Sequence, residues 1–172
     1  MPQIEQVQIT FVPAEDRLLL RVSSGSAEEF RFWLTRRFVA ALRPQLAERL
    51  SGQDHIRLQA SGDARRELLD FERQHAVSSA DFKTPFKEAP RHYPLGEQPV
   101  LLTRFTLRPR DDGSIALTLA PEQGSGIDLA LTPALVHSIL ALLDTALAGA
   151  AWQLTAATTP AATADTPPAV LN

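Results

Sequence analysis

Hydrophobic and polar residues alternate along three short stretches near the start of the chain, and a helical spacing of hydrophobic residues follows them. The alternation predicts β-strands at Glu5–Val12, Arg17–Ser23 and Glu28–Leu34. The helical spacing predicts a helix from about Arg36 to Leu50, and Thr35 is its expected N-cap. Pro44 lies inside this segment, so we expect a kink or a restart of the helix there.

The same order of elements returns later in the chain. Apolar positions 30, 32 and 34 correspond to 127, 129 and 131, a separation of 97 residues that also holds for the second strand and the helix. Only the first strand needs a one-residue adjustment, which matches Phe11–Pro13 to Leu107–Pro109. The second set of predicted strands is Val100–Arg108, Ser114–Ala120 and Gly126–Leu131. We expect Thr132 to cap a helix from Pro133 to about Ala148 that Gly149 stops.

This repetition predicts an α+β fold of internally duplicated β-β-β-α units, each an antiparallel meander plus a helix, related by pseudo-twofold symmetry. One such unit has too little core for independent stability, so we expect both to form a single domain over residues 1–154. Unit one covers 4–50 and unit two covers 100–154. The insert 51–99 contains a helix from Ser61 to about His75 and an irregular connector over 80–99, whose aromatic residues predict packing across the domain. The Ala/Thr/Pro-rich segment 155–172 is a predicted disordered tail.

Two pairs of segments carry a resemblance to known families. They are RLLLRV and EEFRFWLTRRFVAAL within 17–42, and SIALTL and GIDLALTPALVHSIL within 114–140. Their meander-then-helix repeat resembles the PUR-alpha-like proteins and, more loosely, the PC4 and Whirly single-stranded-DNA-binding folds. The resemblance implies a binding protein for single-stranded nucleic acid, although those families have a fourth strand in each unit. The segments also resemble those of small bacterial proteins, a likeness that implies no activity.

Composition narrows the class of protein. The net charge of −3 argues against wholesale binding to duplex nucleic acid, which usually goes with a strong basic excess. The chain has no cysteine, which excludes disulfides, thiolate catalysis and Cys-based zinc sites. The segment Met1–Glu5 lacks the features of a signal peptide, and Pro133, His137, Asp144 and Gly149 interrupt the most apolar stretch. We therefore expect a cytoplasmic protein without membrane association.

Basic and aromatic residues occupy the predicted outer face of the sheets. If Phe30, Phe32 and Leu34 face the helix, Arg31 and Trp33 face away from it. The same alternation places Arg21, Arg104 and Arg108 outward. Guanidinium groups and an aromatic ring can bind the phosphates and bases of a single strand. The alternative interpretation is that these Arg residues are solubilising and that Trp33 meets the insert or a second subunit.

Arg36 and Arg37 form a second basic site at the predicted start of the first helix. Positive side chains oppose the helix dipole there, which favours either an anionic partner or pairing with a nearby acid such as Glu28 or Glu29. The two interpretations are left open.

No pattern in the chain predicts catalysis, a metal or a cofactor. His55, His75, His92 and His137 have no metal-ligand spacing, and His137 is expected to be satisfied or solvent-facing. Glu28-Glu29 and Asp111-Asp112 indicate turns, and Asp70 and Glu72 do not share a helix face. We expect a non-enzymatic binding module.

Two kinds of partner remain open for such a module. The first is single-stranded DNA or RNA, bound by Arg21, Arg31, Trp33, Arg36, Arg37, Arg104 and Arg108. The second is another protein, for which the chain would be an adaptor or structural subunit that binds through its helices and connector. A homodimer is compatible with either alternative.

Overall fold

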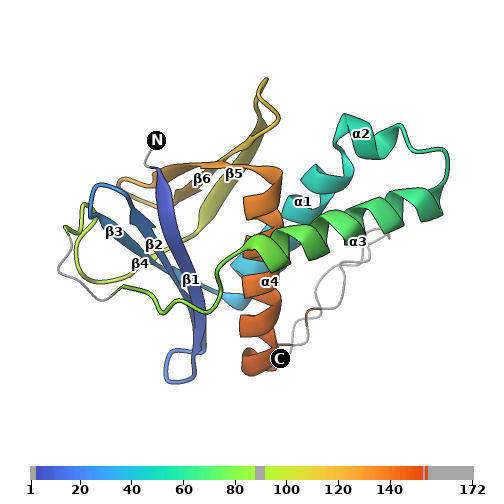
Figure 1. The fold of residues 1–172 in the computed structure, drawn as a ribbon. Helices are drawn as coiled ribbons and strands as arrows, with labels where there is room; N and C mark the ends of the chain where they lie inside the picture. The colour runs from blue at the N-terminus through green and yellow to red at the C-terminus, as the bar shows by residue number, and fades with distance from the viewer. Residues whose placement is uncertain (1–2, 88–91, 153, 155–172) are drawn as a thin grey trace, which may run out of the picture.

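The computed structural model describes residues 3–87, 92–152 and 154 of the 172-residue chain. The described part is an α+β fold with two antiparallel meanders and four helices (Figure 1). The strands are β1 (Ile4–Val12), β2 (Arg17–Ser24), β3 (Glu29–Leu34), β4 (Val100–Leu101), β5 (Arg104–Pro109), β6 (Ile115–Ala120) and β7 (Ile127–Leu131). The helices are α1 (Arg36–Ser51), α2 (Asp54–Arg57), α3 (Gly62–Ser79) and α4 (Pro133–Ala150). The predicted tail 155–172 lies outside the described residues.

The first three strands of one sheet and the three strands of the other have the same antiparallel order. The first sheet has the order β1-β2-β3-β4 and the second has the order β5-β6-β7. In β2 and β3, Leu18, Leu20 and Val22 lie opposite Leu34, Phe32 and Phe30; in β6 and β7, Ile115, Leu117 and Leu119 lie opposite Leu131, Leu129 and Ile127. All twelve side chains are buried, because the alternation puts each on the face that meets the helices.

The first strands of the two sheets correct one detail of the predicted match. Ile9 lies opposite Leu20, and Leu107 lies opposite Leu117, so these first strands correspond at a separation of 98 residues. The predicted match of Phe11 to Leu107 is therefore wrong, because the one-residue adjustment goes in the opposite direction along the chain. The cause of this adjustment is the length of the second hairpin loop. Arg110 N–H donates to the Ser114 carbonyl oxygen, which leaves only residues 111–113 in the turn. Gly113 takes a positive φ of 78° in this turn, a conformation that glycine adopts without strain.

The predicted strand Val100–Arg108 is two strands. Val100 and Leu101 pair in parallel with Phe32 and Trp33 of β3, which makes β4 the far edge of the first sheet. Leu102 then turns its side chain into the core, where it is 1% exposed, and the chain continues as β5 of the second sheet. The requirement to bury Leu102 therefore divides a continuous hydrophobic pattern between two sheets.

Helices pack across the two halves of the chain. α4 packs against β1 of the first half, and α1 packs against β5 of the second half. The Phe38 ring of α1 meets the Phe105 ring of β5 edge to face, with centroids 5.5 Å apart. Trp152, just after α4, meets Phe11 of β1 in the same geometry at 6.0 Å. One hydrophobic core therefore connects both sheets, as the small core of a single unit requires.

Helix ends and interruptions differ from the sequence expectations. α1 continues through Pro44 without a restart. The insert carries two helices, α2 and a longer α3, where one helix is predicted. α4 passes the predicted stop at Gly149 and ends at Ala150, because Ala151 adopts the left-handed conformation that ends many helices. α4 is also long and apolar enough to cross a membrane by length and composition alone, and here it packs against β1, α1 and α3.

Candidate binding sites

Glu29 lies between two of the arginines predicted to bind nucleic acid. The Nε atoms of Arg21 and Arg31 each donate to Glu29 Oε1 at 2.7 Å. The Glu29 side chain is only 1% exposed. Burial raises the pKa of this carboxyl group, but hydrogen bonds from Arg21 and Arg31 and their positive charges outweigh burial and hold the pKa below its ordinary value. Glu29 is therefore an ionised, buried residue of β3, and the turn role predicted for it is wrong.

The connector covers these two arginines. The Phe86 ring lies 4.1 Å from the Arg21 guanidinium carbon, and the Tyr93 ring lies 4.5 Å from that of Arg31. Arg31 also donates to the Tyr93 hydroxyl oxygen at 2.9 Å. Cations stacked on aromatic rings are stabilised by the negative face of the ring. The outer face around Glu29 is thus an internal contact between the sheet and the connector.

The other predicted site residues are dispersed. Trp33 is half-buried, lying opposite Leu19 of β2 and beside Leu101 of β4. Arg36 and Arg37 are exposed at the start of α1. Arg104 donates to the carbonyl oxygens of Pro121 and Glu122, and Arg108 is exposed on β5. The structure therefore brings only Arg21, Arg31 and Trp33 together, on neighbouring positions of one sheet face.

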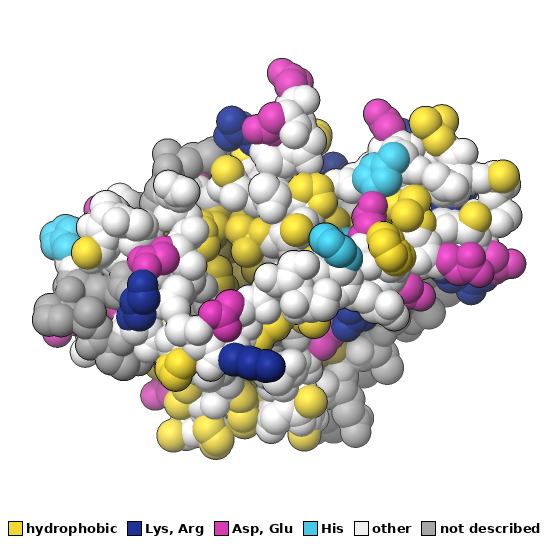
Figure 2. Space-filling model, viewed as in Figure 1, with side chains coloured by type: hydrophobic (Ala, Val, Ile, Leu, Met, Phe, Trp, Pro, Cys, Tyr) yellow, Lys and Arg dark blue, Asp and Glu magenta, His cyan; other side chains and the backbone are white. Residues whose placement is uncertain are grey.

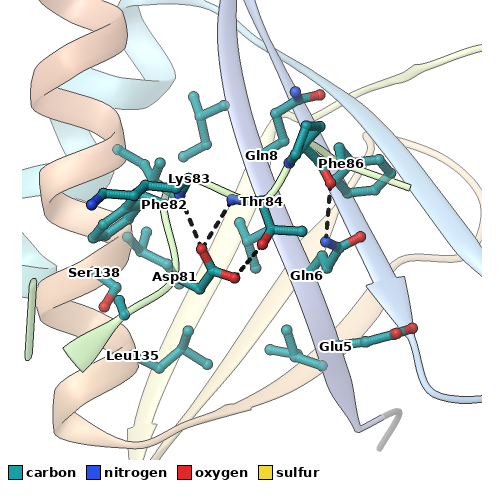
Figure 3. A pocket seen from close by; sticks show the side chains of 17 residues that line it. Glu5, Gln6, Gln8, Asp81, Phe82, Lys83, Thr84, Phe86, Leu135 and Ser138 are labelled. Atoms are coloured by element: carbon teal, nitrogen blue, oxygen red, sulfur yellow. Dashed lines mark hydrogen bonds between the residues drawn. The ribbon is translucent and has the colours of Figure 1, made fainter. Parts of the chain in front are cut away.

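A cavity of about 460 Å³ lies beside β1, between this strand, α4 and residues 80–86 of the connector (Figure 3). Its apolar lining includes Ile4, Val7, Ile9, Phe82, Phe86, Leu135, Ile139 and Leu142. Figure 2 shows hydrophobic side chains gathered in the hollow between β1 and α4. Among the strands of the described residues, β1 pairs with β2 alone, so it is an edge strand, and the cavity adjoins it.

Side-chain hydrogen bonds hold the connector over this cavity. Gln6 of β1 donates to the Pro85 carbonyl oxygen at 3.5 Å and accepts from the Lys87 N–H at 3.0 Å. Asp81 accepts from the backbone N–H groups of Lys83 and Thr84, at 3.0 and 2.9 Å (Figure 3). Hydrogen bonds from the Thr84 side chain and from these two N–H groups lower the pKa of Asp81. In its described residues, the connector is thus folded locally and attached to β1 by side chains, without pairing with that strand.

A second pocket, of about 290 Å³, brings together three of the four histidines. His55 of α2, His75 of α3 and His137 of α4 line it together with Glu72 of α3. His55 Nε2 lies 2.6 Å from Glu72 Oε1, and His137 Nε2 lies 3.8 Å from Glu72 Oε2. His137 is 5% exposed and its Nε2 has no hydrogen-bond partner, so the expectation of a satisfied or solvent-facing residue is wrong.

Sequence spacing could not identify this second pocket. The three histidines come from three helices, and no local pattern relates their positions. Figure 2 shows histidine and acidic side chains gathered beside hydrophobic ones over α2 and α3. Within the described ranges, no group of three or more His, Asp or Glu side chains is arranged to hold a metal ion.

No protein-family model, no curated protein and no solved structure matches this chain. The class that the observations define is an α+β protein with an edge strand beside an apolar cavity and a separate polar pocket.

Proposed function

We propose that this protein is a non-enzymatic binding module that captures an extended segment of a partner protein along β1. The observation that carries the proposal is the edge position of β1 beside an apolar cavity of about 460 Å³. An edge strand presents backbone N–H and C=O groups on its outer side. An extended peptide can pair with those groups and become an additional strand.

The cavity supplies side-chain selectivity for such a peptide. Alternate residues of an extended chain point to the same side, so every second peptide side chain would enter the space lined by Val7, Leu135 and Leu142. Apolar side chains fit that lining. Lys83 and Glu5 also line the cavity and would face polar positions of the peptide. The expected ligand is therefore a short extended segment in which apolar residues alternate with polar ones.

Charge pairing favours a protein partner over single-stranded nucleic acid. Binding of a single strand needs cations that are available to phosphates and an aromatic ring that is open to bases. Arg21 and Arg31 already share Glu29, and aromatic rings of the connector cover them. Nucleic-acid binding through Arg31 and Trp33 stays a prediction, and binding of labelled single strands tests it directly.

We also propose that the two halves arose by internal duplication and are related by a pseudo-twofold axis. Three observations support this origin. The buried pairs of β2 with β3 and of β6 with β7 have one register, separated by 97 residues. Thr35 and Thr132, at the same separation, both accept a hydrogen bond from the backbone N–H three residues ahead. Each of the helices α1 and α4 packs on the first strand of the other half.

The peptide proposal is tested by selecting displayed random peptides on the purified full-length protein. Selected peptides should alternate apolar and polar residues, and a synthetic one should bind in calorimetry. Ser138→Trp would place an indole in the cavity and should weaken binding at least about tenfold, or about 1.4 kcal/mol. Thr145→Trp is the matched control, since Thr145 does not line the cavity and its hydroxyl, like that of Ser138, donates to the carbonyl oxygen four residues earlier in α4.

Three outcomes would overturn the peptide proposal. The first is that no peptide is enriched, and the second is that Ser138→Trp binds like the unmodified protein. The third is salt-sensitive binding of labelled single-stranded DNA or RNA that Arg31→Ala and Trp33→Ala weaken while no peptide binds. Light scattering on the same samples measures the oligomeric state, because two copies could also pair through β1.

A further inference from the structure

Two buried polar atoms at the pocket between α2, α3 and α4 have no hydrogen-bond partner among the described residues. Among the described residues, three buried side-chain atoms lack a hydrogen-bond partner: Ser23 Oγ of β2, Gln53 Oε1 and His137 Nε2. Gln53 and His137 both line this pocket, and the nearest carboxylate oxygen to His137 Nε2, Glu72 Oε2, lies 3.8 Å away. Buried polar atoms are nearly always hydrogen-bonded in folded proteins. Two exceptions beside one cavity therefore indicate a site for a ligand that supplies the missing bonds.

The polar groups of the pocket are mainly hydrogen-bond acceptors. Gln53 presents an amide oxygen, and Glu72 presents a carboxylate. Burial lowers the pKa of His137; the negative charge of Glu72 partly opposes this shift, and Arg73 adds to it. The lowered pKa favours the neutral form of His137, and in the tautomer that carries its proton on Nδ1 the Nε2 atom accepts a hydrogen bond. This combination suits a ligand that donates several hydrogen bonds and carries positive charge.

Aromatic side chains form the other wall of the pocket. Phe71 is 64% exposed, and its ring stacks on that of His75 with centroids 6.4 Å apart and planes 26° apart. A large apolar side chain with this exposure leaves a ring face for a ligand. Such a ring favours both an apolar body and a nearby cation. Pro133 and Ala134 of α4 add further apolar surface.

We propose that this pocket binds a small organic amine, whose ammonium group bonds to Glu72, Gln53 and His137 while its apolar body lies on Phe71. The volume of about 290 Å³ corresponds to a small ligand, at the low end of the usual range for such sites. The lysine side chain of a partner protein has the same chemistry as a free amine. The site is separate from the cavity beside β1, because no residue lines both.

The test uses phenethylamine as the probe, with 2-phenylethanol and 3-phenylpropionate as its neutral and anionic counterparts. Binding is followed on the full chain by changes in the ring proton signals of the histidines and the side-chain amide signals of Gln53. We expect saturable shifts with the amine and affinities at least about tenfold weaker for the two counterparts. A second probe, Nα-acetyl-lysine methyl ester, keeps the lysine side-chain amine free. Tighter binding of this probe than of phenethylamine would indicate a lysine of a partner protein, and weaker binding would indicate a free amine.

Two matched variants distinguish a specific effect of the Glu72 carboxylate from an effect of the overall charge of α3. Glu72→Gln removes the charge that faces the ammonium group and should weaken amine binding at least about tenfold. Glu67→Gln, on an exposed part of the same helix, should leave it unchanged. Circular dichroism of both variants confirms that they are folded.

The pH dependence gives an independent readout. The groups that surround His137 are Glu72, Arg73 and His75 from α3 and His55 from α2. Protonation of His137 adds a positive charge beside Glu72, so amine affinity should fall as the pH is lowered from 8 toward about 5. Equal binding of the amine and the carboxylate probe, unchanged affinity in Glu72→Gln, or no shifts at millimolar amine would overturn the proposal.

Discussion

The two halves of this protein differ in their outer sheet faces although their inner faces match. Inside, Leu20 opposite Phe32 corresponds to Leu117 opposite Leu129, and all four side chains are buried. Outside, the pair Arg21 and Arg31 on β2 and β3 corresponds to Thr118 and Asp128 on β6 and β7. The arginine pair surrounds a buried glutamate, whereas Thr118 donates to Asp128 at 2.5 Å on an exposed face.

The contrast between inner and outer faces shows that core packing constrains the inner residues, whereas local neighbours determine the outer ones. The inner face must fill one shared core, so its residues are fixed in size and hydrophobicity. The outer face has different neighbours in the two halves, because Phe86 and Tyr93 of the connector lie over arginines of the first sheet. Unit two has Gly126 at the position of Glu29, and thus no carboxylate that arginines could share.

The largest expected effect comes from breaking the buried ion cluster. Glu29→Ala leaves Arg21, which is only 9% exposed, without its carboxylate and should lower the free energy of unfolding by about 3–5 kcal/mol. Asp128→Ala, at an exposed position of the second sheet, should cost less than about 1 kcal/mol. Urea denaturation of both variants measures the contrast. Equal losses of unfolding free energy in the two variants would show that the Glu29 cluster is no more important for stability than the exposed Asp128.

The same cluster predicts a pH dependence. The folded pKa of Glu29 lies below its ordinary value of 4.5, so the ionised form is favoured in the folded chain. Its contribution to stability is complete above that ordinary value and is lost as the pH falls through the folded value. In urea titrations from pH 7 to about 3, Glu29→Gln should remove part of the acid-induced loss of stability. A variant with the acid sensitivity of the unmodified protein would contradict this assignment.

Matching substitutions in the two cores test whether the halves are equivalent inside. Leu34 and Leu131 lie at corresponding positions and are at most 1% exposed. Leu34→Ala and Leu131→Ala should each cost about 2–5 kcal/mol, because each removes a buried side chain and leaves a cavity. Because one core joins both sheets, each variant should unfold in a single transition by calorimetry and circular dichroism. Two separate transitions would contradict the shared core.

A close backbone approach in the second sheet has an intermediate expected effect. A Cβ atom added at Gly126 would lie 2.1 Å from the backbone oxygen of Leu119, which is too close without movement of the strands. Gly126→Ala should therefore cost about 1–3 kcal/mol in thermal or urea denaturation. Gly25→Ala is the control, because a Cβ atom there meets nothing within 4 Å. A neutral Gly126→Ala would show that the β6–β7 connection adjusts freely.

The smallest effects are expected at the two helix caps. Thr35 Oγ1 accepts from the Phe38 N–H at 3.2 Å, and Thr132 Oγ1 accepts from the Leu135 N–H at 3.3 Å. Thr35→Ala and Thr132→Ala should each lower stability by about 1 kcal/mol, while the corresponding Ser variants retain most of it. Thermal denaturation should show nearly equal losses. A loss confined to one helix would show that the caps are not equivalent.

The sequence by itself determined the buried faces of the two sheets and the starts of the helices that cover them. Alternation placed the six core positions of β2 and β3 and the six of β6 and β7, and Thr35 and Thr132 marked the helix starts. These features follow from local periodicity and capping, which act over a few neighbouring residues. The α+β class followed from them directly.

Only the tertiary structure decided the sites. Glu29 became the centre of a buried cluster because β2 brings Arg21 beside it and the connector brings Phe86 and Tyr93 over the arginines. His55, His137 and Glu72 meet because three helices pack together, and the cavity beside β1 exists because α4 packs across the halves. These arrangements depend on residues far apart in the chain, whose side chains meet only when the core is formed, so no local pattern encodes them.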